Sequence, residues 1–369
     1  MKTTSRGPLA VLIAVLLAVA AGAGGARAAS DGPHGSGGQG SPVGSAGQGG
    51  SDGQGGSSGP AGVHGAGGAS GAGAASAALT QAGGGRDAAR AEAAEAVRAY
   101  WTPERMRHAA YQGSGPSRGA IEHAQRQLAD PANPADEPGS VPPAAASIPG
   151  APTAADEIPI RVGRILYVDP FDGKDKACDG NALNSGSRRL VVTSGSCVYS
   201  RAAHAWMNNW VFIPGYFRGN APYGKFVGDW GYTFNAWIDD GNMNYDFGLA
   251  TTHPNESGQR LVDRVGGDGF AWNQPKEEFV SANGYSVNGQ IPSGCGGYTR
   301  PASFGGIELP CAPSDGGLSR GGRWLMDVDP DTTLGHVNGV TSIHQPSGWL
   351  QSPYINTEFR DFFYRVADS

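Results

Sequence analysis

The sequence predicts an all-β domain from Glu157 to the C-terminus, and three observations support this. Short runs rich in β-branched and aromatic residues recur along the stretch, Gly, Asn, Asp and Pro residues separate them, and one amphipathic segment closes the chain. The runs are Ile160–Val168, Arg189–Thr193, Trp210–Ile213, Tyr245–Ala250, Glu278–Ala282 and His336–Ile343. Such a pattern over roughly 210 residues suits one sandwich or double barrel.

The closing segment, Thr357–Asp368, predicts a C-terminal helix. Its apolar residues recur at helical spacing and would face the core. They are Phe359, Phe362, Phe363 and Val366.

The first 28 residues have the three parts of an export signal. Lys2 and Arg6 give a positive start, Pro8–Ala20 is an apolar core, and Ala26-Arg27-Ala28 is a small-x-small cleavage site. The core is too short to span a membrane, and no later run of about 20 apolar residues follows. We therefore expect a secreted, extracellular protein without a membrane span; retention as an N-terminal anchor is the alternative.

Residues 29–85 and 131–156 are predicted linkers on either side of a helical segment, 86–130. The first is rich in Gly and Ser with almost no charge, and the second is rich in Pro and Ala, so neither can bury enough apolar surface to order itself. Between them, Ala88–Tyr100 favours helix, and Thr102-Pro103 predicts the cap and first position of a second helix through Ala110. A third helical patch is predicted at Ala120–Leu128.

Charge and cysteine content narrow the function classes. The formal net charge is −6 without a basic patch, so nucleic acid is not an expected partner. Four cysteines in an exported chain predict two disulfides, and spacing alone allows three pairings of Cys178, Cys197, Cys295 and Cys311. Because no Cys-x-x-Cys or His/Cys cluster accompanies them, neither a metal nor another cofactor is expected.

Two segments resemble motifs of the secreted, actinobacterial type of trypsin-like serine peptidases. Val192–Cys197 ends in Thr-Ser-Gly-Ser-Cys and resembles the family's Thr-Ala-Gly-His-Cys signature, with Ser196 where the general-base histidine belongs. Tyr245–Leu249 resembles the family's block around the triad aspartate, which is Asp246 here. The string Tyr-Trp-Thr-Pro-Glu-Arg-Met, from Tyr100, resembles a region that precedes the peptidase domain in such proteins.

A third motif, Gly317–Trp324, resembles the Gly-Gly-Ser-Ser-Gly-Gly-Pro-Trp stretch around the nucleophilic serine. Aligned on its Gly-Gly pair and tryptophan, the motif has Arg320 at the nucleophile. Leu318 replaces a glycine whose backbone N–H helps to bind the developing oxyanion, Ser319 follows it, and Arg323 replaces a proline.

The resemblance implies two Greek-key barrels, at about 157–262 and 263–356, with the site between them. It also implies the disulfides Cys178–Cys197 and Cys295–Cys311, and a hydrogen bond from Ser342 to the triad aspartate.

Acyl transfer on this scaffold needs a hydroxyl nucleophile, an imidazole that takes its proton, and a carboxylate that orients the imidazole. A serine hydroxyl at position 196 accepts no proton near neutral pH, and a guanidinium at position 320 stays protonated and is no nucleophile. We therefore expect a non-catalytic homologue that binds a peptide or protein. We further expect the Arg320 guanidinium to pair with Asp246, the alternative being that Ser196, Ser342 and water hold this carboxylate.

Two other function classes stay open. One is an active serine endopeptidase or other hydrolase with a rearranged site, in which Ser319 is the nucleophile or a histidine is relocated. The histidines of the β domain are His204, His253, His336 and His344. The other is a cell-surface structural or display module.

Two further motifs are interpreted as coincidences. Gly317-x-Ser319-x-Gly321 matches a nucleophile elbow, but that motif needs a strand before it and a helix after it, and turn residues precede it here. The run Asp327-x-Asp329-x-Asp331 resembles a calcium loop but lacks its glycine and its final glutamate, so we expect a hairpin turn.

Overall fold

The computed structural model describes residues 73–79, 87–111, 136–148, 160–286, 289–302, 305–311, 317–345 and 349–369. The chain divides into two units, Met1–Ala66 and Gly67–Ser369, and all described residues belong to the second. The predicted export signal, most of the predicted linker 29–85 and the third helical patch lie outside the described residues.

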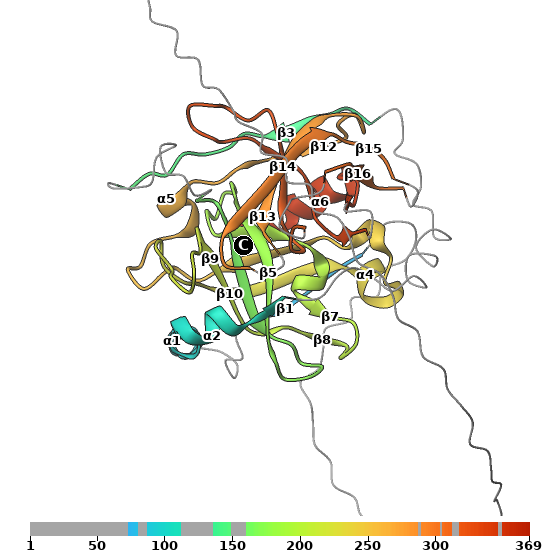
Figure 1. Cartoon of the computed structure of the whole chain (residues 1–369). Coiled ribbons are helices and arrows are strands. Elements are labelled where there is room, and N and C mark those ends of the chain that lie inside the picture. The colour runs from blue at the N-terminus through green and yellow to red at the C-terminus, as the bar shows by residue number, and fades with distance from the viewer. Residues whose placement is uncertain are drawn as a thin grey trace, which may run out of the picture. The chain divides into compact units, whose positions relative to one another are not determined.

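The first half of the β domain is a closed six-stranded barrel (Figure 1). Its strands are β4 (Val162–Val168), β5 (Asp175–Leu183), β6 (Leu190–Thr193), β9 (Asn208–Pro214), β10 (Phe226–Phe234) and β11 (Gly248–Thr252). They run in the order β10-β11-β6-β5-β4-β9, and β9 pairs again with β10, for example at Phe212↔Phe226. The interior holds buried apolar side chains such as Ile165 and Trp210.

Short elements lie between these strands or directly after the last of them. They are the 3-10 turns η1 (Gly195–Cys197) and η2 (Met243–Tyr245), the hairpin β7 (Tyr199–Ser200) and β8 (Ala205–Trp206), and the helices α4 (Asn235–Asp240) and α5 (Leu261–Val265).

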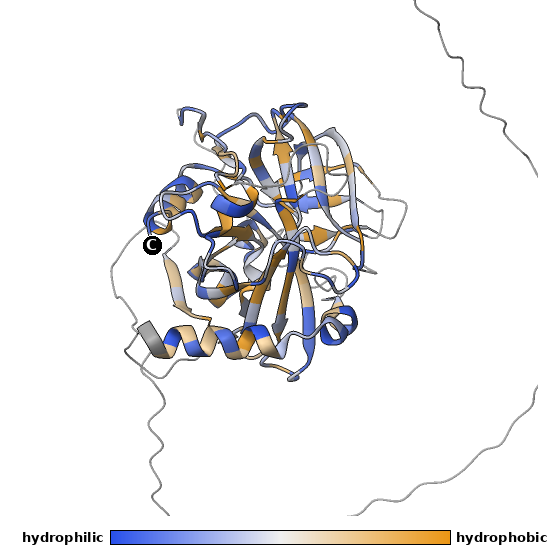
Figure 2. Ribbon diagram, turned by 90° about the vertical axis from the view of Figure 1, so that its left-hand side faces the viewer, coloured by the Kyte–Doolittle hydropathy of each residue, from blue (hydrophilic) through white to orange (hydrophobic). Residues whose placement is uncertain are grey.

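The second half contains a six-stranded and a four-stranded sheet. The larger sheet has β3 (Gly139–Val141), β12 (Gly269–Trp272), β13 (Phe279–Tyr285), β14 (Pro292–Tyr298), β17 (Arg323–Met326) and β18 (His336–Val340). The smaller has β15 (Arg300–Pro301), β16 (Ile307–Leu309), β19 (Ile343–His344) and β20 (Leu350–Ser352). Apolar residues concentrate along the strands of the domain (Figure 2). The closed barrel and these two sheets confirm the all-β prediction.

The C-terminal helix α6 (Thr357–Val366) was predicted and packs against both halves. Asn356 caps it by accepting hydrogen bonds from the next backbone N–H groups. Its four apolar residues are buried: Phe362 contacts Phe234 of the first half, and Phe363 stacks on Phe270 of the second. This shared cluster fixes the two halves relative to one another.

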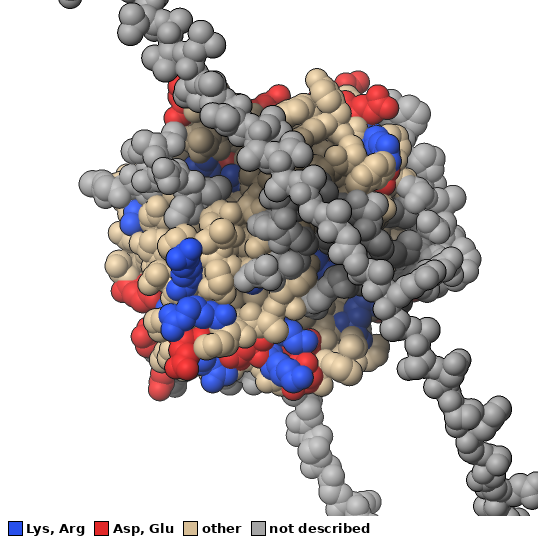
Figure 3. Space-filling view, viewed as in Figure 1, with Lys and Arg blue, Asp and Glu red and all other residues tan. Residues whose placement is uncertain are grey.

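Helices α1 (Asp87–Tyr100) and α2 (Pro103–His108) pack on the first barrel, and Thr102 caps α2 as predicted. Trp101 between them is fully buried, and its indole N–H donates a hydrogen bond to the carbonyl of Asn209 at 2.6 Å. Acidic and basic side chains lie intermixed on the face drawn in Figure 3. Arg105 of α2 forms an ion pair with Asp175 of β5 at 3.0 Å. The helical segment therefore packs against the β domain, although the sequence predicted two separate parts.

Two short strands lie inside the ranges predicted as linkers, and this corrects the prediction there. Strand β1 (Ala74–Ala78) pairs antiparallel with β10, and β3 pairs antiparallel with β12. Each of these strands adds to a sheet edge, where the backbone of the neighbouring strand supplies hydrogen-bond partners. Composition alone does not reveal such an edge.

Two predicted strands are interrupted at residues that belong to the site. The run Tyr245–Ala250 begins as the turn η2, and the strand starts only at Gly248. The run His336–Ile343 breaks after Val340, where Thr341 and Ser342 leave the ladder. Asp246 and Ser342, whose side chains are hydrogen-bonded to each other, lie at these two interruptions.

Candidate functional site

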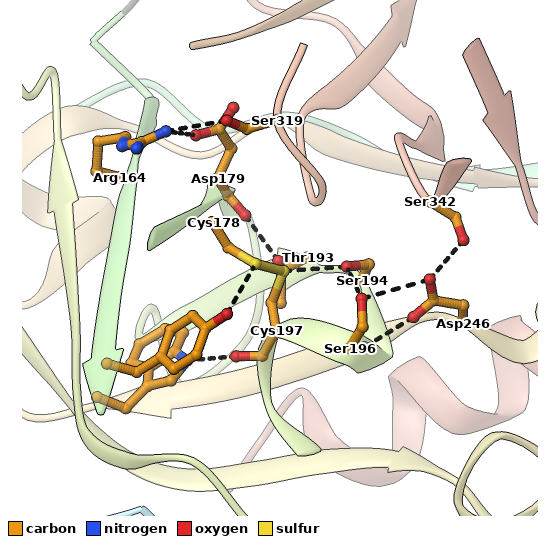
Figure 4. Close-up of a disulfide and its surroundings, with 12 residues drawn as sticks. Arg164, Cys178, Asp179, Thr193, Ser194, Ser196, Cys197, Asp246, Ser319 and Ser342 are labelled. Atoms are coloured by element: carbon orange, nitrogen blue, oxygen red, sulfur yellow. Dashed lines mark hydrogen bonds and ion pairs between the residues drawn. A yellow bond between two sulfur atoms is a disulfide. The ribbon is translucent and has the colours of Figure 1, made fainter. Parts of the chain in front are cut away.

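A fully buried carboxylate, Asp246, is the centre of the candidate site (Figure 4). It follows η2, and its Oδ1 accepts a hydrogen bond from the backbone N–H of Ser196 at 2.7 Å. Its Oδ2 accepts hydrogen bonds from the hydroxyls of Ser342 and, at 3.5 Å, Ser196. Burial raises the pKa of Asp246, although the Arg320 charge and these three hydrogen bonds lower it. The structure thus brings Ser196, Asp246 and Ser342 together.

Ser196 lies in η1 directly before a disulfide. The Cys178–Cys197 bridge joins this turn to β5, and the Cys295–Cys311 bridge lies in the second half, so both expected pairings are confirmed. The carbonyl of Cys197 accepts a hydrogen bond from the buried indole of Trp210 at 3.0 Å. The position of Ser196 is therefore fixed by a covalent link and by the barrel core.

The backbone of Arg320 lies next to this disulfide, because its carbonyl accepts a hydrogen bond from the N–H of Asp179 at 2.7 Å. Gly321 follows with φ +84°, and a Cβ there would lie 2.0 Å from the carbonyl oxygen of Asp179. This close approach requires glycine.

The expected ion pair between Arg320 and Asp246 is not found. No salt bridge joins these two described residues, and the buried Nε of Arg320 has no hydrogen-bond partner. The guanidinium lies near enough to lower the pKa of Asp246, but the two serines hold the carboxylate, as in the alternative. Ser196 and Ser342 already donate hydrogen bonds to both carboxylate oxygens of Asp246, so the carboxylate does not need a contact with the guanidinium.

Ser319 turns away from Asp246 and toward a second buried carboxylate (Figure 4). Its hydroxyl accepts a hydrogen bond from Arg164 at 3.0 Å, and the same nitrogen of Arg164 contacts Asp179 at 3.0 Å. Asp179 also accepts from the N–H of Tyr285 at 2.6 Å. Burial raises the pKa of Asp179 to about 7 against the lowering effect of Arg164 and this N–H. No motif in the sequence pointed to this pair.

The two remaining substitutions in the third motif are built into the interior. Leu318 is completely buried in the apolar cluster of the second half, beside Trp324. Arg323 begins β17 and forms a buried ion pair with Asp268, which also pairs with Arg161. The loop that contains Arg320 is thus anchored on both sides.

The described histidines do not supply a base to this site. His204 lies in a turn with φ +48°, and His253 faces Asp229 in a part-buried ion-pair cluster. His336 pairs with Met326 in the sheet, and no hydrogen bond joins it to Asp246 or Ser319 among the described residues. The side chain of His344 lies outside the described residues.

The two coincidental motifs have the structure expected of them. A strand, β17, follows Gly317-x-Ser319-x-Gly321 where an elbow needs a helix. Asp329 accepts hydrogen bonds from the N–H groups of Asp331 and Thr332, which forms a turn. No cluster of three or more metal-ligating side chains occurs in the described ranges.

Two findings concern the rest of the molecule. A pocket of about 270 Å³ lies elsewhere, lined among others by Tyr223, Asn255 and Arg264, and contains none of the predicted site residues. In the part of the chain that the structure describes, no helix has the length and apolar character needed to cross a membrane.

Comparisons with known proteins bear on the fold of the chain. No family model matches the chain. The chain is similar to the protease Anisep from Arthrobacter nicotinovorans, with 28% identity and a TM-score of 0.52 over 58% of this chain and 98% of that one. It shares the fold of the thermostable serine protease AL20 from an extremophilic microorganism, with 22% identity and a TM-score of 0.52 over 57% of this chain and 98% of that one.

A curated relative matches over a shorter stretch. An extracellular metalloprotease of Bacillus subtilis (strain 168) is 33% identical over 79 residues, which are 21% of this chain and 24% of that protein. The chain thus spans about a quarter of the length of this relative. The closed barrel, the two sheets, the C-terminal helix and the similarity to Anisep together show that the chain has the chymotrypsin fold of the trypsin-like serine proteases.

Proposed function

We propose that this protein is a secreted, non-catalytic homologue of trypsin-like serine peptidases that acts by binding a peptide or protein segment. The observation that carries the proposal is the pair of substitutions around Asp246. Ser196 stands where an imidazole would take a proton, and Arg320 stands where a nucleophile would attack. Each substitution removes a group that acyl transfer needs, while Ser196 and Ser342 keep the buried carboxylate hydrogen-bonded.

The alternative nucleophile, Ser319, is poorly suited to attack. Its hydroxyl contacts a guanidinium, which cannot accept its proton, and its side chain is completely buried. A serine in this setting is not activated, because activation needs an adjacent general base. The ion-pair network around Arg164 therefore favours a structural role for Ser319.

Secretion fits the same proposal. Two disulfides are typical of proteins that fold in an oxidising compartment, and the sequence begins with the features of an export signal.

A defined mixture of synthetic peptides tests the proposed function. The purified protein is incubated with the mixture at neutral pH, retained peptides are identified by mass spectrometry, and new peptide termini are counted. We expect retention of intact peptides and no new termini. New termini that disappear in the Ser319→Ala variant would instead establish the rearranged hydrolase.

A further inference from the structure

One edge of β5 beside the candidate site is not covered by the other strands of the barrel. Residues 175–181 of β5 pair with β4 on one side, whereas β6 pairs only with Asn181–Leu183 on the other. The backbone of Lys176 and Ala177 on that second side is therefore available for another strand. It lies directly before Cys178 and Asp179, the residues that contact η1 and the backbone of Arg320.

A segment of the chain itself occupies this edge. Strand β2 (Ala110–Tyr111) follows α2 and pairs in parallel with β5, in the register Ala110↔Lys176 and Tyr111↔Ala177. Addition of a strand to a free sheet edge is a general way in which proteins bind extended peptides, because the backbone supplies the hydrogen bonds and individual side chains supply specificity.

The side chain of Tyr111 lies at the site. Burial raises the pKa of its phenol, and the Asp179 carboxylate also raises it, whereas the charges of Arg320 and Arg164 and the backbone N–H of Arg320 lower it. Two guanidinium groups and one backbone N–H thus oppose a single carboxylate at the phenol. In an active peptidase, the backbone N–H at the nucleophile position binds the developing oxyanion, so here a phenol oxygen lies beside the corresponding group.

The segment is held in place from both sides. The hydroxyl of Tyr216 donates to the carbonyl of Met106 at 3.1 Å, and the amide of Gln290 donates to the carbonyl of Arg107 at 3.1 Å. With the buried Trp101, these contacts attach α2 to both halves of the domain and deliver β2 to the edge of β5. The tether keeps Tyr111 at a high effective concentration beside Arg320.

We propose that Ala110–Tyr111 is a tethered ligand of this site, and that the external ligand is an extended peptide with a tyrosine, which pairs with β5 in place of β2. This inference rests on the proposed function and specifies its ligand class. The edge of β5 selects an extended backbone, and the guanidinium groups of Arg320 and Arg164 with the Arg320 N–H select a hydroxyl-bearing aromatic side chain.

Competition between the tether and a free peptide tests the proposal. The probe is a fluorescein-labelled peptide with the sequence of residues 107–114, Arg-His-Ala-Ala-Tyr-Gln-Gly-Ser, and its partner has Ala in place of Tyr. Binding is measured by fluorescence anisotropy to the wild-type chain, to Tyr111→Ala and to Ala110→Pro/Tyr111→Ala, whose proline removes a backbone donor of β2. The matched control is Tyr364→Ala, since Tyr364 is an exposed tyrosine on α6.

We expect the tyrosine peptide to bind the double variant at least tenfold more tightly than it binds the wild type or Tyr364→Ala. The affinity of Tyr111→Ala for the tyrosine peptide should lie between that of the double variant and that of the wild type. The alanine peptide should show no such gain in affinity. Equal affinity for all four proteins, equal gains for both peptides, or binding to none of them would overturn the proposal. Peptide retention by the wild-type protein without cleavage would still leave the proposed function standing, so the two failures are distinguishable.

Discussion

Asp246 is a buried carboxylate whose hydrogen-bond partners are two serines rather than a cation. Its raised pKa means that the folded chain keeps this proton at pH values where the unfolded chain, with an ordinary carboxyl pKa of about 4, has released it. The contribution of Asp246 to the free energy of unfolding is therefore greatest at low pH and declines as pH rises through the raised pKa.

Asp246→Asn should remove this pH dependence. An amide keeps the hydrogen bonds with Ser196 and Ser342 without burying a charge, so the free energy of unfolding at pH 8 should rise by on the order of 1 kcal/mol relative to wild type. Urea unfolding of both proteins from pH 4 to pH 8 measures the difference. A difference that is independent of pH would show that Asp246 is not the titrating group.

Restoring the lost side chains should not restore peptidase activity. Ser196→His alone supplies a base but leaves Arg320 at the nucleophile position, so the new imidazole has no hydroxyl to deprotonate. Ser196→His/Arg320→Ser should also stay close to background, because Leu318 is anchored in the core and prevents the loop from adopting the glycine-dependent form that binds the oxyanion. Hydrolysis of a fluorogenic peptide measures both variants. Strong turnover by the single variant would mean that another residue is the nucleophile.

Among the elements, α1 and α2 behave as part of the folded domain. Trp101 is a large, fully buried side chain that packs in one cluster with residues of the first barrel. Trp101→Ala should lower the free energy of unfolding by about 3–5 kcal/mol, the usual cost of removing a buried tryptophan. Tyr364→Ala, on the exposed face of α6, is the control and should cost less than about 1 kcal/mol. A small effect of Trp101→Ala would mean that the helices detach from the barrel before it unfolds.

The Cys178–Cys197 disulfide ties η1 to β5 across 19 residues of sequence. Cys178→Ser/Cys197→Ser should destabilise the protein by about 3 kcal/mol, because the bridge restricts the unfolded chain. Thermal unfolding of the oxidised wild type and the double variant measures this cost. Unchanged stability would show that the barrel core alone holds Ser196 in place.

Local sequence patterns predicted elements whose contacts are local or periodic. The apolar stripe of α6 and the Thr-Pro cap of α2 are of this kind, and both were predicted. Strands β1, β2 and β3 have no such pattern, because each is a short run that exists only where a distant strand offers a free edge. The same holds for Asp179 and Arg164, whose pairing depends on the barrel closing.

At the scale of the whole molecule, the helical segment and the two halves share buried contacts. Limited proteolysis should therefore leave residues 87–111 associated with the β domain even after cuts in the preceding and following segments. Native mass spectrometry of the digest measures this association. Release of the helical segment from an otherwise folded domain would support the separate domain that the sequence composition predicted.

The proposed lack of a catalytic nucleophile can be tested with a fluorophosphonate serine probe. The purified full-length protein is treated with the probe beside an active trypsin-like protease, and adducts are mapped by mass spectrometry. We expect no stoichiometric adduct on any serine, including Ser196 and Ser319. A stoichiometric adduct on either residue, lost on heat denaturation before labelling, would contradict it.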